Sequence, residues 1–212
     1  MKKLLLILVI ICGFAQVMDA QIKNIEVGGI YSTNTKIFID NHINNDVNRI
    51  ANILYKPTYG GEVILDLGTR YFVFPSSLEV SYITGQMSNY ECLDNEALGW
   101  KEGDLNSIKS FSIMYYAGVD LIEDIMGKPT RVKFPLKLGV GYTNTDAGPA
   151  SCNLMAFGAR AQLKLYISDH FGIYAGAGYK GRITGGLKTK QEGLNVGQNG
   201  LFFDAGIVIG LN

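Results

Sequence analysis

The chain is poor in the residues from which metal sites and catalytic sites are usually built. It holds two histidines and three cysteines among 212 residues, and none of them lies at the spacing of a metal site. Its formal net charge is zero, which gives no support for a nucleic-acid partner. Beyond an N-terminal apolar run, no segment approaches the ~20 apolar residues of a membrane-spanning helix. The remaining chain therefore crosses a membrane as a β-barrel or does not cross one.

Proline is also scarce, whereas glycine and the aromatic residues are abundant. The chain has 5 prolines against 26 glycines, 12 tyrosines and 10 phenylalanines. This composition is typical of a chain rich in strands. Pro75 and Pro135 stand at or near the start of two of the strand-like segments described below, where a strand tolerates proline.

The N-terminus has the pattern of a secretory signal peptide. A basic tripeptide opens the chain, and an apolar run over 4–14 follows it. Small and polar residues come next, and cleavage is expected after Ala20 or after Ala15. We predict that residues 1–20 are removed on export and that residues 21–212 form a single domain.

Two neighbouring segments, 154–167 and 171–184, alternate between apolar and polar residues. In the first segment Leu163 lies on an apolar face, whereas Arg160 and Lys164 lie on the opposite face. A strand of ~10 residues with an apolar outer face and a polar inner face is what a transmembrane barrel requires. The pattern therefore predicts a barrel with lipid outside and a polar lumen.

Eight such segments fit into the chain, which predicts an all-β fold: an eight-stranded antiparallel up-and-down transmembrane β-barrel. Short connections alternate with long polar ones, as in outer-membrane barrels, where the short turns face the periplasm and the long loops face outward. We expect the long loops at 32–57, 87–106 and 185–198, with a shorter one at 145–153. The expected strands are 22–31, 58–68, 77–86, 107–119, 132–144, 154–167, 171–184 and 199–212.

Alternation along these strands places ten charged side chains in the lumen, with the acids on one arc of the wall and the bases on the opposite arc. Buried charges need partners, so we expect ion pairs across the lumen. This arrangement is read either as a static plug, which we favour for a narrow barrel, or as a gated polar conduit. The acids are Glu26, Glu62, Asp66, Glu79 and Asp204, and the bases are Lys133, Lys137, Arg160, Lys164 and Lys180.

The outward faces carry the apolar residues, with aromatic residues near the strand ends, as in an interfacial girdle. A soluble lipocalin-like barrel would need the opposite arrangement, with its charges outside. The expected lipid-facing residues are Val63, Leu65, Val80, Phe134, Leu136, Leu138, Val140, Leu163, Leu165, Ile207 and Ile209, and the expected girdle is Tyr82, Tyr115, Tyr142, Phe171, Tyr179 and Phe203.

Two sequence features that could indicate chemistry have simpler explanations. Gly176-Ala-Gly-Tyr-Lys-Gly181 has the spacing of a dinucleotide fingerprint, but no helix follows it, so we interpret its glycines as making room in a narrow lumen. His42 falls in the first long loop and His170 in a three-residue turn, so neither is expected beside a nucleophile. We expect no enzymatic activity, no cofactor and no metal.

Two cysteines remain after removal of the signal peptide. Cys92 and Cys152 fall in the second and third expected outer loops, and an exported chain meets an oxidising compartment. They are a candidate disulfide, and the alternative is a pair of free thiols.

The signal peptide, the eight alternating segments and the final strand Gly200-Leu-Phe-Phe-Asp-Ala-Gly-Ile-Val-Ile-Gly-Leu-Asn212 resemble the small outer-membrane β-barrel proteins of the OmpA/OmpX type. The resemblance implies insertion by the barrel-assembly machinery and contact with outer-membrane lipid and lipopolysaccharide. It implies a structural or surface-interaction role, in membrane integrity, adhesion or as an antigen, with an extracellular ligand reached through the outer loops. The alternative function is a narrow pore or an accessory part of a secretion machine.

Overall fold

The computed structural model describes residues 21–43, 46–68, 75–92, 102–183 and 194–211. The expected signal peptide, residues 1–20, lies outside this part of the chain. None of the helices in the described residues combines the length and the apolarity needed to cross a membrane.

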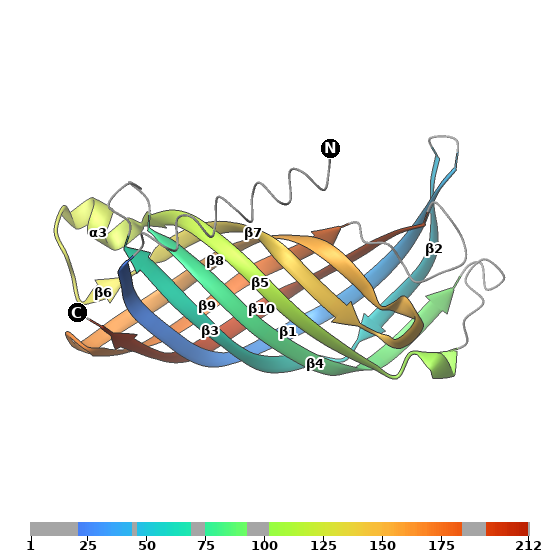
Figure 1. Ribbon diagram of the computed structural model, residues 1–212, viewed down its shortest axis with the longest axis horizontal. Helices are drawn as coiled ribbons and strands as arrows, with labels where there is room; N and C mark the ends of the chain where they lie inside the picture. Colours follow the sequence, from blue (N-terminus) through green and yellow to red (C-terminus); the bar gives the residue numbers. More distant parts are fainter. Residues whose placement is uncertain (1–20, 44–45, 69–74, 93–101, 184–193, 212) are drawn as a thin grey trace.

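The described residues form one antiparallel sheet that closes on itself, because the last strand pairs with the first along most of its length (Figure 1). Around the wall the order is β10, β9, β8, β7, β5, β4, then a position shared by β2 and β3, then β1. β2 and β3 follow one another along this shared position, since both pair with β1 on one side and with β4 on the other. The predicted eight-stranded up-and-down barrel is therefore confirmed. The strands are β1 (Gln21–Ile43), β2 (Asp46–Tyr55), β3 (Thr58–Gly68), β4 (Ser76–Cys92), β5 (Ser107–Asp120), β6 (Val132–Lys133), β7 (Pro135–Asp146), β8 (Cys152–Ser168), β9 (Phe171–Ile183) and β10 (Leu194–Gly210).

The two ends of the barrel differ. One end, called the turn end below, carries the β8–β9 turn, the end of β10 and the short helix α3 (Leu121–Met126) (Figure 1). Asp120 caps this helix, since its carboxylate accepts from the backbone N–H groups of Ile122 and Glu123. Gly127 ends it in the left-handed conformation, at a φ of 63°. The other end, called the loop end, carries the β1–β2 hairpin and the 3₁₀ turns η1 (Glu102–Asp104) and η2 (Gly148–Ala150).

The first expected loop, 32–57, is wrong. β1 runs on for 23 residues and returns as β2, so most of this segment is wall rather than loop. A bulge between Thr33 and Lys36 shifts the register against β10 and exchanges the faces: Ser32 is buried before it and Ile37 after it. Likewise β4 extends beyond the expected strand to Cys92.

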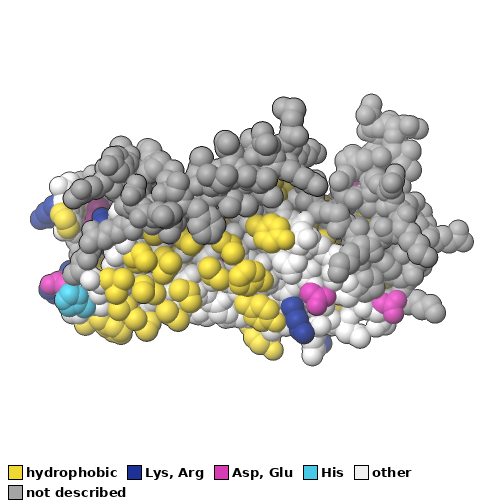
Figure 2. Space-filling view, viewed as in Figure 1, with side chains coloured by type: hydrophobic (Ala, Val, Ile, Leu, Met, Phe, Trp, Pro, Cys, Tyr) yellow, Lys and Arg dark blue, Asp and Glu magenta, His cyan; other side chains and the backbone are white. Residues whose placement is uncertain are grey.

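Outward side chains near the turn end form an apolar belt (Figure 2). It consists of strand residues whose side chains are well exposed although they are large and apolar. Such a surface exceeds what a soluble monomer usually shows to water, and it suits lipid. Members of the belt are Val27, Val63, Val80, Ile113, Leu138, Val140, Phe157, Leu163, Leu165, Ile173, Leu201, Phe203, Ile207 and Ile209.

Toward the loop end the polarity of the wall is reversed. This loop-end section comprises the described residues within 35–58, 85–92, 102–110, 143–154 and 194–200. Polar residues face outward there, for example Asn144 and Asn153, whose side chains are hydrogen-bonded across neighbouring strands at 2.7 Å. The interior is filled by an apolar cluster, as in a soluble barrel. Its buried members are Ile37, Ile39, Ala51, Ile53, Tyr55, Leu105, Ile108, Ala147, Ala150, Cys152 and Leu154.

Glycine makes room for the large side chains of the lumen. A Cβ on Gly178 would come within 2.4 Å of the Phe202 ring, and one on Gly139 within 2.5 Å of the Tyr116 ring. In an eight-stranded barrel the interior is only just wide enough for side chains to fill it. The fingerprint-like Gly176-to-Gly181 segment lies within β9, in a strand rather than at the start of a helix.

Candidate functional site: the ion network of the lumen

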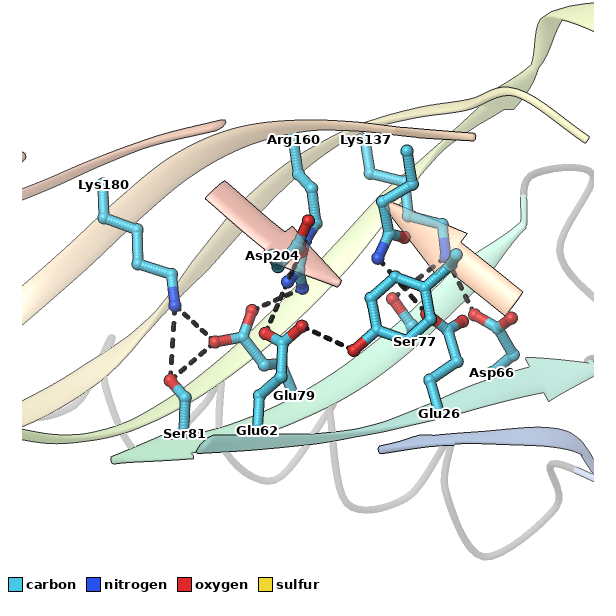
Figure 3. Close-up of polar contacts among 12 residues, drawn as sticks. Glu26, Glu62, Asp66, Ser77, Glu79, Ser81, Lys137, Arg160, Lys180 and Asp204 are labelled. Atoms are coloured by element: carbon cyan, nitrogen blue, oxygen red, sulfur yellow. Dashed lines mark hydrogen bonds and ion pairs between the residues drawn. The ribbon is translucent and has the colours of Figure 1, made fainter. Parts of the chain in front are cut away.

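The lumen beneath the belt is crossed by ion pairs between two arcs of the wall (Figure 3). The carboxylates come from four strands that are consecutive around the wall, β10, β1, β3 and β4. The cations come from β7, β8 and β9. Between β4 and β7, β5 offers hydroxyls and apolar groups instead of charge, including Ser112 and Met114. The alternation of side chains along each strand is what aims both sets inward.

The central group of the network gathers around Arg160. Its guanidinium binds three carboxylates: Nη1 lies 2.8 Å from Glu79 Oε2, Nε lies 2.8 Å from Asp204 Oδ2, and Nη2 contacts both Glu62 and Asp204. Lys180 binds Glu79 from the loop-end side. All five side chains are buried, at no more than 6% exposure, so each charge depends on the others for its stabilisation.

Hydroxyl groups add hydrogen bonds to two of the central carboxylates, Glu62 and Glu79, whereas Asp204 Oδ1 has no hydrogen-bond partner among the described residues. Tyr174 donates to Glu62 Oε1 at 2.9 Å, and Ser81 donates to Glu79 Oε1 at 2.6 Å. Ser81 Oγ in turn accepts from Lys180 at 3.3 Å. A buried charge that is both paired and hydrogen-bonded is far less costly than one that is paired alone.

The turn-end group lies one layer nearer the α3 end and repeats the pattern with lysines. Asp66 accepts from Lys137 at 2.9 Å and from Lys164 at 2.7 Å. Lys164 also binds Glu26, whose second oxygen accepts from Gln162 Nε2 at 3.2 Å. The network therefore consists of two linked layers across the lumen.

Aromatic rings pack against the cations of the central group. The Arg160 guanidinium lies 5.2 Å from the Phe202 ring centre and 5.8 Å from that of Tyr116, and Lys180 Nζ lies 4.9 Å from the Phe202 ring. Cations at these distances are attracted to ring faces. The rings therefore share the interior of the barrel with the ion pairs.

Nine of the ten predicted lumen charges lie in these two groups, and Lys133 does not. Lys133 lies on β6 at the turn-end mouth, half exposed, and pairs with Glu123 of α3 at 2.9 Å. Lys133 is the cross-strand partner of Lys164 and lines the turn-end cavity, so the predicted inward face holds, but its place at the rim gives it a partner on α3 instead of one across the lumen. Its Nζ lies 5.6 Å from the ring centre of Tyr166.

One buried cation escaped the prediction. Arg182 lies two residues beyond Lys180 on β9 and therefore on the same face, so the alternation already pointed to it. It is 4% exposed and donates to Thr143 Oγ1 at 3.2 Å. Together with Arg182, the two groups contain five cations and five carboxylates, so their formal charges cancel.

Two cavities lie along the lumen axis. One of about 10 Å³, room for about one water, lies on the loop-end side of the central group, between Ser81, Arg182 and Phe202. The other, of about 210 Å³, opens at the turn end above Asp66 and Lys164. Between them the central group fills the cross-section.

The two cysteines, a candidate disulfide, are free thiols in the structure. Cys92 ends β4 and Cys152 begins β8, and these two strands are not neighbours in the wall. Both cysteines pack on the same apolar cluster. Burial raises the pKa of the Cys152 thiol to about 11, against a smaller opposing effect of Arg182. Burial, with a smaller contribution from Cys152, raises the pKa of Tyr55 well above its ordinary value.

Residues that could support other chemistry lie apart from the network. His170 is exposed in the turn between β8 and β9, and His42 lies on β1 rather than in a loop. Within the described residues, no three His, Cys, Asp or Glu side chains are arranged to hold a metal ion.

No protein-family model matches the sequence, and no curated protein matches it. Among solved structures, the outer membrane protein OprG from Pseudomonas aeruginosa aligns with a TM-score of 0.56 at 11% identity, over 88% of this chain and 93% of that protein. Neisserial surface protein A aligns with a TM-score of 0.45 at 11% identity, over 91% of this chain and 99% of that protein. The likeness to OprG shows that the chain has the fold of a small outer-membrane β-barrel.

Proposed function

We propose that the protein is an integral outer-membrane barrel with a closed lumen, and that its role is structural and interactive rather than conductive. The observation that carries this proposal is the Arg160 group: one guanidinium held by three carboxylates, all buried, across the full width of the lumen. A conduit would need mobile, hydrated charges along its wall. Here each charge is fixed by a partner from the opposite arc.

The location in the outer membrane is supported by the apolar belt and by the fold. Large apolar side chains such as Leu138, 72% exposed, and Leu163, 42% exposed, face outward around the wall. Aromatic residues such as Tyr142, Tyr179 and Phe171 lie among them, as in an interfacial girdle. A closed barrel leaves no unpaired strand edge in lipid. Contact with lipid and lipopolysaccharide and insertion by the barrel-assembly machinery follow from this location.

A surface-interaction role is supported by the length of the wall beyond the belt. At about 3.3 Å per residue, the 23 residues of β1 exceed the 9–11 residues that cross a bilayer. The loop-end section therefore extends the wall of the barrel beyond the belt, and its interior is filled by the apolar cluster. This extension of the wall presents the outer loops to an extracellular ligand, whether the role is adhesion or recognition.

Planar-bilayer conductance tests the proposal against the alternative of a narrow pore. We expect purified wild-type protein, reconstituted in planar bilayers, to show no stable single-channel steps. The folded protein should also migrate differently on unheated and heated gels and should fractionate with outer membranes. Stable conductance of the wild-type protein would favour the pore, and recovery in the soluble periplasm would overturn the membrane assignment.

A further inference from the structure

The cavity at the turn end lies outside the central group of the lumen and shares Asp66, Lys137 and Lys164 with the turn-end group. It measures about 210 Å³ and opens beside α3 and β6. This volume has room for several water molecules or for one small organic ion, and it is below the usual range for a drug-sized ligand. Four lysines and three carboxylates line it: Lys23, Lys133, Lys137, Lys164, Asp66, Asp120 and Glu123.

Each of the three carboxylates in the lining is already bound by donors of the protein. Asp66 is shared by two lysines of the turn-end group. Asp120 accepts from the backbone N–H groups of Ile122, Glu123 and Phe134. Glu123 is paired with Lys133. Each carboxylate of the lining therefore already has a cation or a backbone donor of the protein, which lowers its attraction for a further cation.

Donor capacity, by contrast, is left over. Within the described part of the chain, the buried hydroxyls of Ser76 and Tyr166 have no hydrogen-bond partner, and both residues line the cavity. Ser76 is only 2% exposed, so its hydroxyl is costly to leave unpaired. Lys23, on the rim, makes no ion pair among the described residues. All three groups can donate, so they favour a ligand that accepts hydrogen bonds.

We propose that the turn-end cavity is a binding site for a small oxyanion, a single carboxylate or phosphate group on a small body, held by Lys23, Ser76 and Tyr166. The lining carries one more cation than carboxylates, which favours a singly charged anion. The site belongs to the folded barrel itself. It does not depend on whether the lumen conducts, so its test is independent of the proposed function.

The test uses the full chain folded in detergent micelles, titrated with sodium phosphate and with sodium acetate. Backbone amide chemical shifts of Lys23, Ser76 and Tyr166 report binding. We expect saturable shifts with at least one of the two oxyanions and none with sodium chloride at equal ionic strength. Which of the two binds more tightly identifies the ligand as phosphate-like or carboxylate-like. Shifts that never saturate, or that chloride reproduces, would overturn the site.

Variants localise the effect. The double variant Ser76→Ala/Tyr166→Phe removes only two unpaired hydroxyls, so it should fold normally, and we expect its affinity to fall about tenfold. Lys23→Gln should weaken binding about fivefold. The matched controls are Tyr82→Phe on the belt and Lys56→Gln at the loop end, which should bind as the wild type does. Unchanged affinity in the double variant would show that the anion binds elsewhere.

Discussion

On β8, Leu163 faces outward while Arg160 and Lys164 face the lumen, but nearer the loop end of the same strand Asn153 faces outward while Leu154 is buried inside. The outer face of this one strand therefore changes from apolar near the turn end to polar near the loop end. Under the belt the outer surface suits lipid, and the interior is held by paired charges. In the loop-end section the outer surface suits water, and the interior is an apolar cluster.

The comparison shows that the interior of one barrel can be occupied by two different kinds of interaction. Ion pairs such as those of Arg160 are directional and stabilise only if every partner is present. Apolar packing such as that around Ile53 is non-directional and tolerates small changes of shape. The two sections should therefore respond differently to the same class of substitution, and the expected effects below run from the largest to the smallest.

Arg160→Ala should have the largest effect. It leaves the carboxylates of Glu62, Glu79 and Asp204 buried around an empty position, and breaking such a group costs about 3–5 kcal/mol. The free energy of unfolding, measured with urea in detergent or lipid, should fall by this amount. Because the side chain also occupies the lumen, the variant should show higher conductance than the wild type.

The control for Arg160→Ala is Leu163→Ala on the same strand, whose side chain is 42% exposed and faces away from the lumen. It should leave conductance unchanged. If Leu163→Ala altered conductance while Arg160→Ala did not, the inward and outward faces of β8 would be exchanged, since a shift of one residue reverses every side chain.

Ile53→Ala tests the apolar interior of the loop-end section. Ile53 is fully buried in the cluster, and removing its side chain should lower the free energy of unfolding by about 2–5 kcal/mol. Its neighbour Leu54 is 37% exposed on the other face, so Leu54→Ala should cost less than about 0.5 kcal/mol. A larger loss for Leu54→Ala than for Ile53→Ala would contradict the reversed polarity.

Two outward positions on β7 test where the belt ends. Val140 lies in the belt and Asn144 lies in the loop-end section, on the same face of the strand. Val140→Lys should make folding into lipid bilayers less favourable by about 2–4 kcal/mol, whereas Asn144→Lys should have almost no effect. Equal effects of the two substitutions, measured by folding into vesicles, would mean that the belt extends farther along β7 than the structure indicates.

Alkylation of the cysteines has the smallest expected effect. Because burial raises the pKa of Cys152 to about 11, its thiol stays protonated at neutral pH and should resist alkylation in the folded protein. The stability that comes from keeping this thiol neutral is fully present below about pH 9 and is lost as the pH rises toward 11. Mass spectrometry after denaturation without reduction should find two alkylated thiols, and a single bridged species would restore the disulfide prediction.

The alternation in the sequence was enough to predict the barrel and most of its lumen. Lys137, Arg160 and Lys164 alternate with apolar neighbours, so their face follows from the pleat alone. The same rule would have found Arg182. It gave the correct face for Lys133 but not its partner, which is Glu123 of α3. It missed β2 because the bulge near Thr33 exchanges the faces where the polarity also reverses.

By itself the sequence determined the class of the protein, the number of strands in the wall at the level of the belt, and the two arcs of opposite charge. These features depend on a period of two along each strand. Only the tertiary structure decided which charges meet, since a contact such as Arg160 with Glu62 joins strands from opposite sides of the barrel. Such contacts are set by the tilt and stagger of the closed sheet, which no single strand encodes. The structure alone also showed that the wall continues past the belt with its polarity reversed, because the packing of the apolar cluster decides which face is buried there.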